Sequence, residues 1–258
     1  MAVTANEAAP GRTDAVVVAH PRPSVIRVTL AGHGGHRLDR DTVSALLAAV
    51  DQAEATPGAR VLVLDAAGET FCAGLALDEL AGDAWRPVIA AVHRLLSRLV
   101  RSPLVTVAVV DGAAIGGGVG LAAACDQVIA GRRARFRLTE VVLGLVPALV
   151  LPLVVQRAGP AKALSLALTA PELLAPDALA CGLADQLADD AERALNALLA
   201  RLRATDPRAT RAVKSYHAAL TERGPAPEPV VMALLAERFA DPGTRTRLAR
   251  FGGTGRSS

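Results

Sequence analysis

Two glycine-containing stretches carry the strongest chemical signal in this sequence. Residues 69–78 follow a short apolar run at 61–64, and residues 111–120 directly follow a second apolar run at 105–110. Glycine turns at the ends of buried strands let backbone N–H groups point into a cleft, and a helix N-terminus adds the positive end of its dipole. Two such donors that converge from separate loops form an oxyanion hole, which stabilises the enolate of a thioester. Taken alone, either loop is also compatible with a tight turn that binds nothing.

The segment Gly118–Ala123 also satisfies the dinucleotide-binding pattern GxGxxG/A, but its spacing excludes this function. Seven residues separate Val110 from Gly118, whereas the fingerprint needs its first glycine in the tight turn after the strand. No strand that ends in an acid follows at the offset expected for a ribose contact. The sequence contains no Gly–Lys–Ser/Thr, so a phosphate-binding P-loop is excluded as well.

The elements that position these loops alternate in type along the first two-thirds of the chain. Apolar runs predict strands at 15–19, 25–30, 61–64, 105–110, 127–130 and 134–137. Helical periodicity or composition predicts helices at 41–55, 83–100, 121–125, 191–204, 207–221 and 229–240. The order of these elements predicts an α/β fold with repeated crossovers and a helical C-terminal region. We expect a flexible N-terminus at 1–13, an α/β core with the active site at 14–190, a helical region at 191–251 and a flexible tail at 252–258.

Composition limits the class of function. With 52% hydrophobic and 21% charged residues the chain can bury a sizeable core. The net charge is only +3, the arginines are interleaved with acids, and aromatic residues make up 2%. Nucleic acid is therefore not the expected partner.

The three cysteines, which are odd in number and lie in apolar surroundings, indicate a reducing cytoplasm and no metal site. No signal peptide is visible, and no apolar run is long enough to span a bilayer, so a cytoplasmic protein without membrane contact is expected.

Residues 71–75 (Phe-Cys-Ala-Gly-Leu) and 115–121 (Ile-Gly-Gly-Gly-Val-Gly-Leu) resemble the two oxyanion loops of the enoyl-CoA hydratase/isomerase (crotonase) superfamily. The resemblance continues through 136–148, 159–163 and 175–185 and covers roughly residues 15–220. It implies a crotonase-like spiral of ββα repeats. It also implies that the helical C-terminal region builds a homotrimer or a dimer of trimers.

The same resemblance implies roles for individual residues. The backbone N–H groups of Leu75 and Gly117 are placed in the oxyanion hole, and Glu140 occupies the family's second acid/base position. The implied substrate-binding positions are Phe71, Ala73, Gly74, Gly116, Gly118, Leu143 and His33. Without the resemblance, Glu140 is equally compatible with a structural carboxylate at a helix start. The acyl group is expected on the phosphopantetheine arm of CoA or of an acyl carrier protein, with no other cofactor.

One departure from the family pattern changes the expected chemistry. Hydratases carry another glutamate three residues after the middle glycine of the triple, and that position is Gly120 here. Because glycine transfers no proton, hydration by water held between two carboxylates is not expected. A single base at Glu140 can remove the proton alpha to the carbonyl and return it to a departing hydroxyl, which is a syn dehydration. It can also return the proton to a distal carbon, which is a double-bond isomerisation.

Residues 136–157 and 211–217 resemble more narrowly the dehydratases of polyketide β-branching cassettes, which also keep one glutamate at the position of Glu140. Those lyases convert 3-hydroxy-3-methylglutaryl on an acyl carrier protein to 3-methylglutaconyl in antibiotic biosynthesis. The first loop is closer to a general member of the superfamily. The leading hypothesis is therefore an acyl-thioester dehydratase. The alternatives are a Δ3/Δ2-enoyl-CoA isomerase or other single-glutamate crotonase, and a non-catalytic acyl-carrier or RNA-binding protein on the same fold.

Other polar residues receive structural interpretations. His33 and His36 are expected to be solvated loop residues, with contact to a substrate carboxylate as the alternative. Asp126 is expected to be a hydrogen-bond hub, and Cys72 has no histidine nearby in sequence to make it a nucleophile. A small basic cluster is expected to be a solvated turn, with an acidic carrier protein or a phosphate as alternative partner. It consists of Arg132, Arg133 and Arg135.

Overall fold

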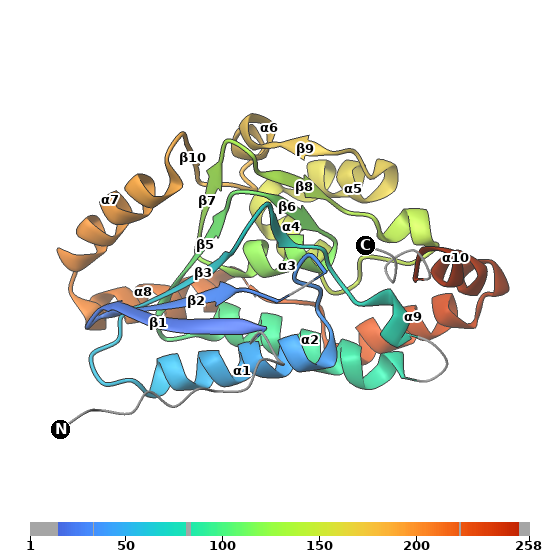
Figure 1. Cartoon of the computed structure of the whole chain (residues 1–258), viewed down its shortest axis with the longest axis horizontal. Coiled ribbons are helices and arrows are strands. Elements are labelled where there is room, and N and C mark those ends of the chain that lie inside the picture. The colour runs from blue at the N-terminus through green and yellow to red at the C-terminus, as the bar shows by residue number, and fades with distance from the viewer. Residues whose placement is uncertain (1–14, 33, 81–83, 222, 253–258) are drawn as a thin grey trace, which may run out of the picture.

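The structure is a computed structural model and describes residues 15–32, 34–80, 84–221 and 223–252. Its larger sheet has the order β1-β2-β3-β5-β7-β10 (Figure 1). All of its neighbouring strands are parallel except β1 and β2, which form an antiparallel pair. These strands are β1 (Val16–Arg22), β2 (Val25–Leu30), β3 (Val61–Ala66), β5 (Val105–Val110), β7 (Gln127–Gly131) and β10 (Gln186–Ala188).

A smaller sheet has the order β4-β6-β8-β9 and lies at the ends of three strands of the larger one. The chain enters it repeatedly, because β3 is followed by β4, β5 by β6 and β7 by β8. Each turn of this spiral therefore gives one strand to each sheet, and the loops that leave the smaller sheet start near one another. Its strands are β4 (Thr70–Cys72), β6 (Ala113–Ile115), β8 (Arg135–Arg137) and β9 (Leu173–Leu174).

Helices cover both faces of the larger sheet. The main core lies between that sheet and α1 to α5, with α6 and α9 added at its edges. A second apolar cluster on the opposite face joins alternate valines of β3 and β5 to Leu195 and Leu198 of α7. Strands buried on both faces have continuous apolar sequences, as is typical of parallel sheets. These helices are α1 (Arg40–Ala55), α2 (Trp85–Arg101), α3 (Gly117–Ala124), α4 (Leu151–Ala158), α5 (Pro160–Thr169), α6 (Ala175–Ala180), α7 (Ala191–Arg203) and α9 (Glu228–Ala240).

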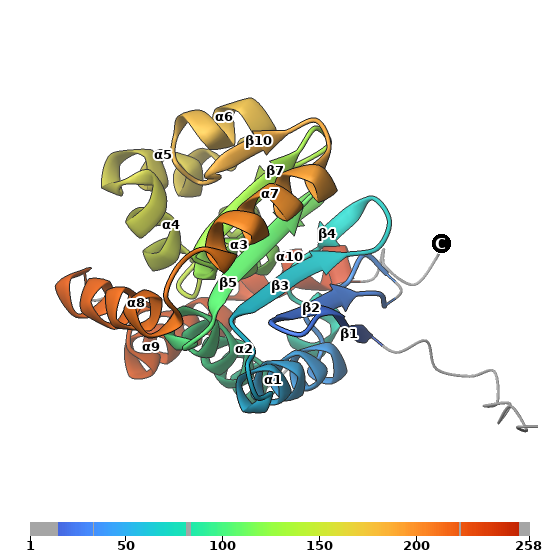
Figure 2. The same cartoon turned by 90° about the vertical axis from the view of Figure 1, so that its left-hand side faces the viewer.

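The helix α8 (Pro207–Thr221) lies outside the core and contains no buried residue. Figure 2 shows it at the edge of the molecule above α9. A polar contact attaches it, because Asp126 accepts from Lys214 of α8 at 2.5 Å and from Arg223, just after α8, at 2.8 Å. Asp126 also accepts hydrogen bonds from the backbone N–H and the hydroxyl of Thr106. The structural role expected for Asp126 is confirmed.

The C-terminal helix α10 (Pro242–Gly252) packs against α9 and against two short 3-10 helices. One of these, η1 (Leu77–Leu80), follows β4, and the other, η2 (Glu140–Leu143), follows β8. In the described part of the chain, no helix combines the length and hydropathy that a membrane span needs.

The predicted fold class is confirmed, and the main strand and helix positions agree within a few residues. The short strands β4, β6, β9 and β10 were not predicted, because runs of two or three residues carry no detectable period. The helices α4, α5, α6 and α10 were not assigned from the sequence either. Helix α3 begins at Gly117, four residues before the predicted start at 121. The cause is the glycine triple, whose composition favours a loop although Gly117 and Gly118 are helical here and Gly116 is the N-cap.

Candidate functional site

The first loop of the site leaves β4 through Ala73, Gly74 and Leu75. Gly74 has φ +85°, and a Cβ atom there would lie 2.7 Å from the carbonyl oxygen of Ile115 in the second loop. Only glycine permits so close an approach in this conformation. The N–H of Leu38 donates to the Gly74 carbonyl at 2.7 Å, and the N–H of Ala73 donates to the Gly35 carbonyl at 2.8 Å. The loop is therefore fixed by its backbone.

The second loop leaves β6 and turns directly into α3. Gly116 is the N-cap of this helix, with φ +47°, and its own N–H donates to the Arg137 carbonyl at 2.8 Å. Gly118 must also be glycine, because a Cβ atom there would lie 2.3 Å from the carbonyl oxygen of Cys72. The triple glycine therefore lets the first turn of α3 press against β4. The first N–H groups of a helix have no partner within it.

The two loops bring the N–H groups of Leu75 and Gly117 together. A Cβ atom on Gly117 would lie 3.8 Å from the Leu75 nitrogen, and one on Gly74 would lie 3.4 Å from the Gly117 nitrogen. Among the described residues, no protein group accepts a hydrogen bond from either N–H. Two adjacent, unused donors at a helix N-terminus are suited to binding an oxygen that gains negative charge.

Glu140 lies beside these donors. Its Oε1 atom is 3.2 Å from the position of a Cβ atom on Gly116, so the carboxyl group rests on the glycine that precedes Gly117. The residue as a whole is half-buried, yet its Oε2 atom is buried and has no hydrogen-bond partner among the described residues. A carboxyl group held this way is available to exchange a proton with a bound molecule.

Burial controls the charge state of Glu140. It raises the pKa of this carboxyl from 4.5 to about 7, against an opposing effect of the N–H groups of Glu140 and Thr139. Desolvation disfavours the charged form, and no charged side chain among the described residues contributes to the shift. A carboxyl group with a pKa near 7 can accept and release a proton at neutral pH.

Gly120 faces an apolar wall. A Cβ atom there would lie 3.0 Å from Cγ2 of Val150 and 3.5 Å from Cδ1 of Leu96, and both side chains are buried. This position therefore packs α3 against α2 and α4 and supplies no second carboxylate.

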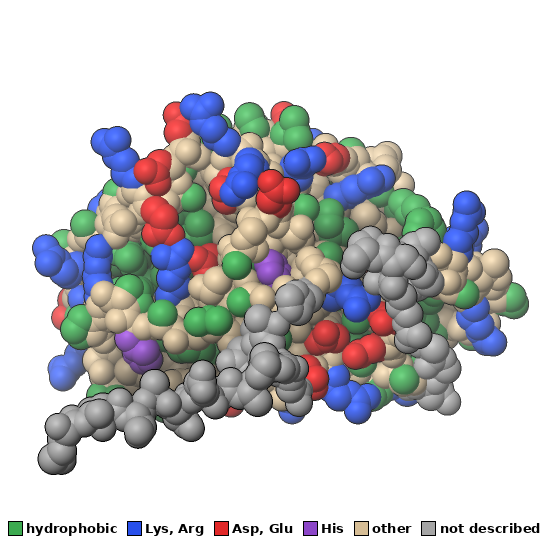
Figure 3. All heavy atoms as spheres, in the orientation of Figure 1, with side chains coloured by type: hydrophobic (Ala, Val, Ile, Leu, Met, Phe, Trp, Pro, Cys, Tyr) green, Lys and Arg blue, Asp and Glu red, His purple; other side chains and the backbone are tan. Residues whose placement is uncertain are grey.

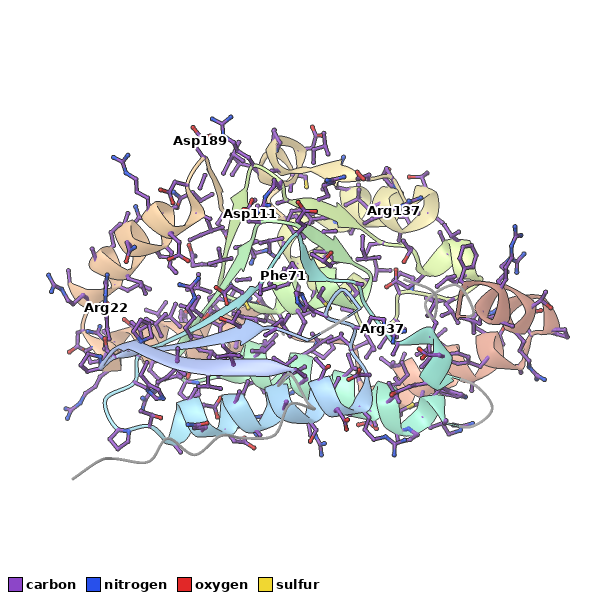
Figure 4. All side chains as sticks on the ribbon, in the orientation of Figure 1. Arg22, Arg37, Phe71, Asp111, Arg137 and Asp189 are labelled. Atoms are coloured by element: carbon purple, nitrogen blue, oxygen red, sulfur yellow. The ribbon has the colours of Figure 1, made fainter. Side chains whose placement is uncertain are left out.

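The other predicted substrate-binding residues differ in how deeply they are buried. Phe71 is 1% exposed and belongs to the main core, and Figure 4 places it near the centre of the view, where the strands converge. Leu143 is buried in the same core at the end of η2. Ala73 is partly exposed beside the donors. His33 lies outside the described residues.

His36 is not the solvated loop residue that the sequence suggested. It is 7% exposed, has φ +55°, and its Nδ1 atom lies 2.8 Å from the carbonyl oxygen of Thr70. The sequence gives no sign of this, because the partner is a backbone carbonyl of a strand too short to predict. Cys72 is a buried thiol whose pKa burial raises to about 12, which agrees with the expectation that it is no nucleophile.

The basic cluster of three arginines is paired with acids. Arg132 lies 2.8 Å from Asp189, and Arg133 lies 2.8 Å from Asp111. The third pair, Arg135 and Glu172, is at 4.0 Å. On the face seen in Figure 3, acidic and basic side chains interleave across this region. The expected solvated turn is therefore observed, with its positive charge balanced locally.

The contact of α10 with η2, which Thr244 and Gly144 make, was not predicted from the sequence. A local signal for this helix was present, because Asp241 followed by Pro242 is a typical N-cap and first helical residue. No local pattern indicates what the helix packs against.

Two mostly parallel sheets joined by a spiral, with paired glycine loops and the buried carboxyl group of Glu140 beside them, define an α/β enzyme of the crotonase fold. Over residues 22–241 the chain matches the enoyl-CoA hydratase/isomerase family. It belongs to that family.

The relatives are named as a dehydratase, an isomerase and a putative hydratase. The bacillaene synthase dehydratase PksH of Bacillus subtilis is 28% identical over 90% of this chain and 92% of its own length. The 1,2-epoxyphenylacetyl-CoA isomerase of Escherichia coli is 34% identical over 74% of this chain and 77% of its own. A putative enoyl-CoA hydratase of Thermus thermophilus is 38% identical, and the match spans 58% of this chain and 62% of that protein.

Solved structures agree with the fold. The crystal structure of the Bacillus subtilis PksH protein superposes with a TM-score of 0.80 at 25% identity, over 94% of this chain and 98% of that one. An enoyl-CoA hydratase from Mycobacterium avium gives a TM-score of 0.84 at 28% identity, with coverage of 94% and 98%.

Proposed function

We propose that this chain is an acyl-thioester dehydratase that converts 3-hydroxy-3-methylglutaryl on an acyl carrier protein to 3-methylglutaconyl in polyketide β-branching. The observation that carries this proposal is the buried carboxyl group of Glu140, which among the described residues is the acid beside the two unused backbone donors. Gly120 supplies no second carboxylate with which to hold an attacking water. A relative named as a dehydratase of bacillaene synthase, similar over 90% of the chain, supports the same choice.

In this mechanism the N–H groups of Leu75 and Gly117 bind the thioester carbonyl oxygen. Glu140, in its ionised form, removes the proton from the carbon next to the carbonyl, and the electron pair moves to that oxygen as an enolate. Collapse of the enolate expels the hydroxyl group from the next carbon, and Glu140 returns the proton to it. The products are water and the unsaturated thioester, and Glu140 is restored. One residue can serve as base and then as acid because its pKa lies near 7.

The proposal predicts a strong effect of Glu140→Gln. Incubation with 3-hydroxy-3-methylglutaryl-carrier protein, followed by mass spectrometry of the carrier, should show loss of one water with the wild type. We expect the variant to lose about 10²–10⁴-fold in rate, which is the usual contribution of a general acid/base. Glu69→Gln is the matched control, since that side chain is 90% exposed. Undiminished water loss in Glu140→Gln would exclude this mechanism.

A second function has its own support. The same base and donors suffice for a Δ3/Δ2-enoyl-CoA isomerase, and one relative at 34% identity is named as an isomerase. Conversion of a 3-enoyl thioester, with the hydroxyacyl substrate left unchanged, would favour this activity. Thioester binding without turnover, unaffected by Glu140→Gln, would instead favour a non-catalytic carrier or RNA-binding protein.

The proposal also includes the oligomeric state of the protein and its cellular compartment. The exposed face of α8 presents Val213, Tyr216 and Leu220, each more than 60% exposed. Residues at this spacing share one face of a helix, and a contiguous apolar face of this kind supports self-association as a trimer or a dimer of trimers. The three cysteines are free thiols, which suits work in the cytoplasm.

A further inference from the structure

The C-terminal helix α10 contacts both segments that form the candidate site. It packs against η1, which follows the first loop, and against η2, which begins with Glu140. Its residue Leu248 belongs to the main core together with Phe239 of α9. Figure 1 shows α10 at the right-hand end of the molecule, beside α9. The helix is therefore docked on the body of the protein.

Thr244 makes the polar contact between α10 and the turn of Glu140. It is 0% exposed, and its hydroxyl donates to the Gly144 carbonyl at 3.1 Å. Within the described parts of the chain, this is the one hydrogen bond that joins residues 139–145 to another element. The N–H of Thr244 donates to the Asp241 carboxylate at 2.7 Å, which fixes the start of α10.

The turn itself has little other support on its outer side. It is closed from within, since the N–H of Gly144 donates to Val141 at 3.1 Å and the N–H of Leu145 donates to Glu140 at 2.9 Å. Val141 and Val142 are 41% and 45% exposed. Leu143 and Leu145 anchor the turn in the main core on its inner side, so on the outer side its position depends on the contact that Thr244 makes with Gly144.

We propose that Thr244 is a positioning residue, which holds the η2 turn through Gly144 and so keeps the Glu140 carboxyl group seated on Gly116. This inference rests on the proposed function, in which Glu140 is the acid/base. The physical reason is the steep dependence of proton transfer on geometry. A distant change that misplaces a reacting group by about 1 Å can lower a rate on the order of 100-fold.

The matched pair Thr244→Val and Thr246→Val tests this proposal. Both threonines lie on α10, but the hydroxyl of Thr246 donates within its own helix, to Pro242 at 3.0 Å. We expect Thr244→Val to lower kcat about 10- to 100-fold with little change in KM, and Thr246→Val to leave kcat unchanged. The pH profile of kcat/KM adds a second readout. Its apparent pKa, near 7 in the wild type, should fall toward 4.5 in Thr244→Val as water reaches the carboxyl group.

Two further comparisons keep the proposal falsifiable if Thr244→Val does not fold. Thr244→Ser and Thr244→Ala are both smaller than threonine and differ only by the hydroxyl, so kcat should be retained in the first and lost in the second. Equal kcat in these two variants would overturn the proposal. Asp241→Ala removes the helix cap but keeps the hydroxyl. A loss of kcat as large as that of Thr244→Val would assign the effect to the start of α10 and also overturn it.

The proposed function can fail separately from this inference. If the wild type turns over no hydroxyacyl thioester, the pKa of Glu140 is still measurable from the difference in stability between wild type and Glu140→Gln across pH. A pKa that falls in Thr244→Val but not in Thr246→Val supports the positioning role without any substrate. An unchanged pKa in both variants contradicts it.

Discussion

At the residue scale, the surroundings of Glu140 disfavour the ionised form of its carboxyl group. The pKa of this carboxyl is about 7 in the folded protein and 4.5 in its ordinary state. Between these values the folded chain binds more protons than the unfolded chain, so the free energy of unfolding falls as pH rises from about 4.5 through 7. Above that window the ionised, buried group costs roughly 3 kcal/mol. Such a cost at one position is typical of a functional site.

We therefore predict that Glu140→Gln stabilises the protein at high pH. Relative to the wild type, the variant should gain up to roughly 3 kcal/mol between pH 4.5 and pH 8, because the amide carries no charge to desolvate. Urea unfolding of both proteins at the two pH values measures this gain. Glu69→Gln, at an exposed side chain, should show no such pH-dependent change. A difference between Glu140→Gln and wild type that is independent of pH would contradict the burial of the charge.

At the element scale, the docking of α10 onto η2 depends on one glycine. Gly144 has φ +79°, and a Cβ atom there would lie 2.6 Å from the Thr244 hydroxyl oxygen. Gly58 has φ +78°, and a Cβ atom there would meet nothing within 4 Å. The two positions therefore share a positive φ and differ in what surrounds them.

Gly144→Ala should cost more than Gly58→Ala. We expect about 1–2 kcal/mol at Gly58 from the backbone conformation alone, and roughly 1–3 kcal/mol more at Gly144 from the overpacked contact. Only Gly144→Ala should also lower kcat. Urea unfolding and steady-state kinetics of the two variants check both statements. Equal losses of stability would show that α10 can shift away from the added methyl group at no cost in free energy.

The sequence predicted the parts of the site that depend on local backbone chemistry. Glycines after two buried runs located both loops, and the glycine at 120 indicated a missing carboxylate. Three features of the site could not be predicted. They are the close approach of Gly118 to Cys72, the contact of the Glu140 carboxyl group with Gly116, and the burial of His36. Each of these depends on a short strand or a contact between distant segments, and neither leaves a period in the sequence.

At the scale of the whole molecule, α8 combines a polar attachment with an uncovered apolar face. Lys214 and Arg223 hold this region to Asp126, while Val213, Tyr216 and Leu220 face outward. An isolated subunit would therefore keep α8 in place yet leave these side chains in water. Association that buries them gains about 25 cal/mol per Å² of apolar surface.

We predict that Tyr216→Glu weakens self-association. A charge in an apolar contact must be desolvated without a partner, which costs several kcal/mol. Sedimentation velocity should show a shift from oligomer to monomer relative to the wild type. Ser215→Glu, at an exposed position about 100° away around the same helix, should leave the sedimentation coefficient unchanged. If both variants sediment as the wild type does, this face of α8 is not a subunit contact.

The docking of α10 also sets an order of events during synthesis. Gly144 and Thr244 are 100 residues apart in the chain, so the turn that carries Glu140 leaves the ribosome well before the helix that covers it. At about 5–20 residues per second this interval lasts on the order of 5–20 s. During that time the nascent protein has both glycine loops and the Glu140 carboxyl group, but the η2 turn lacks its contact with α10. The contact that holds Gly144 is therefore made only after α10 has been synthesised.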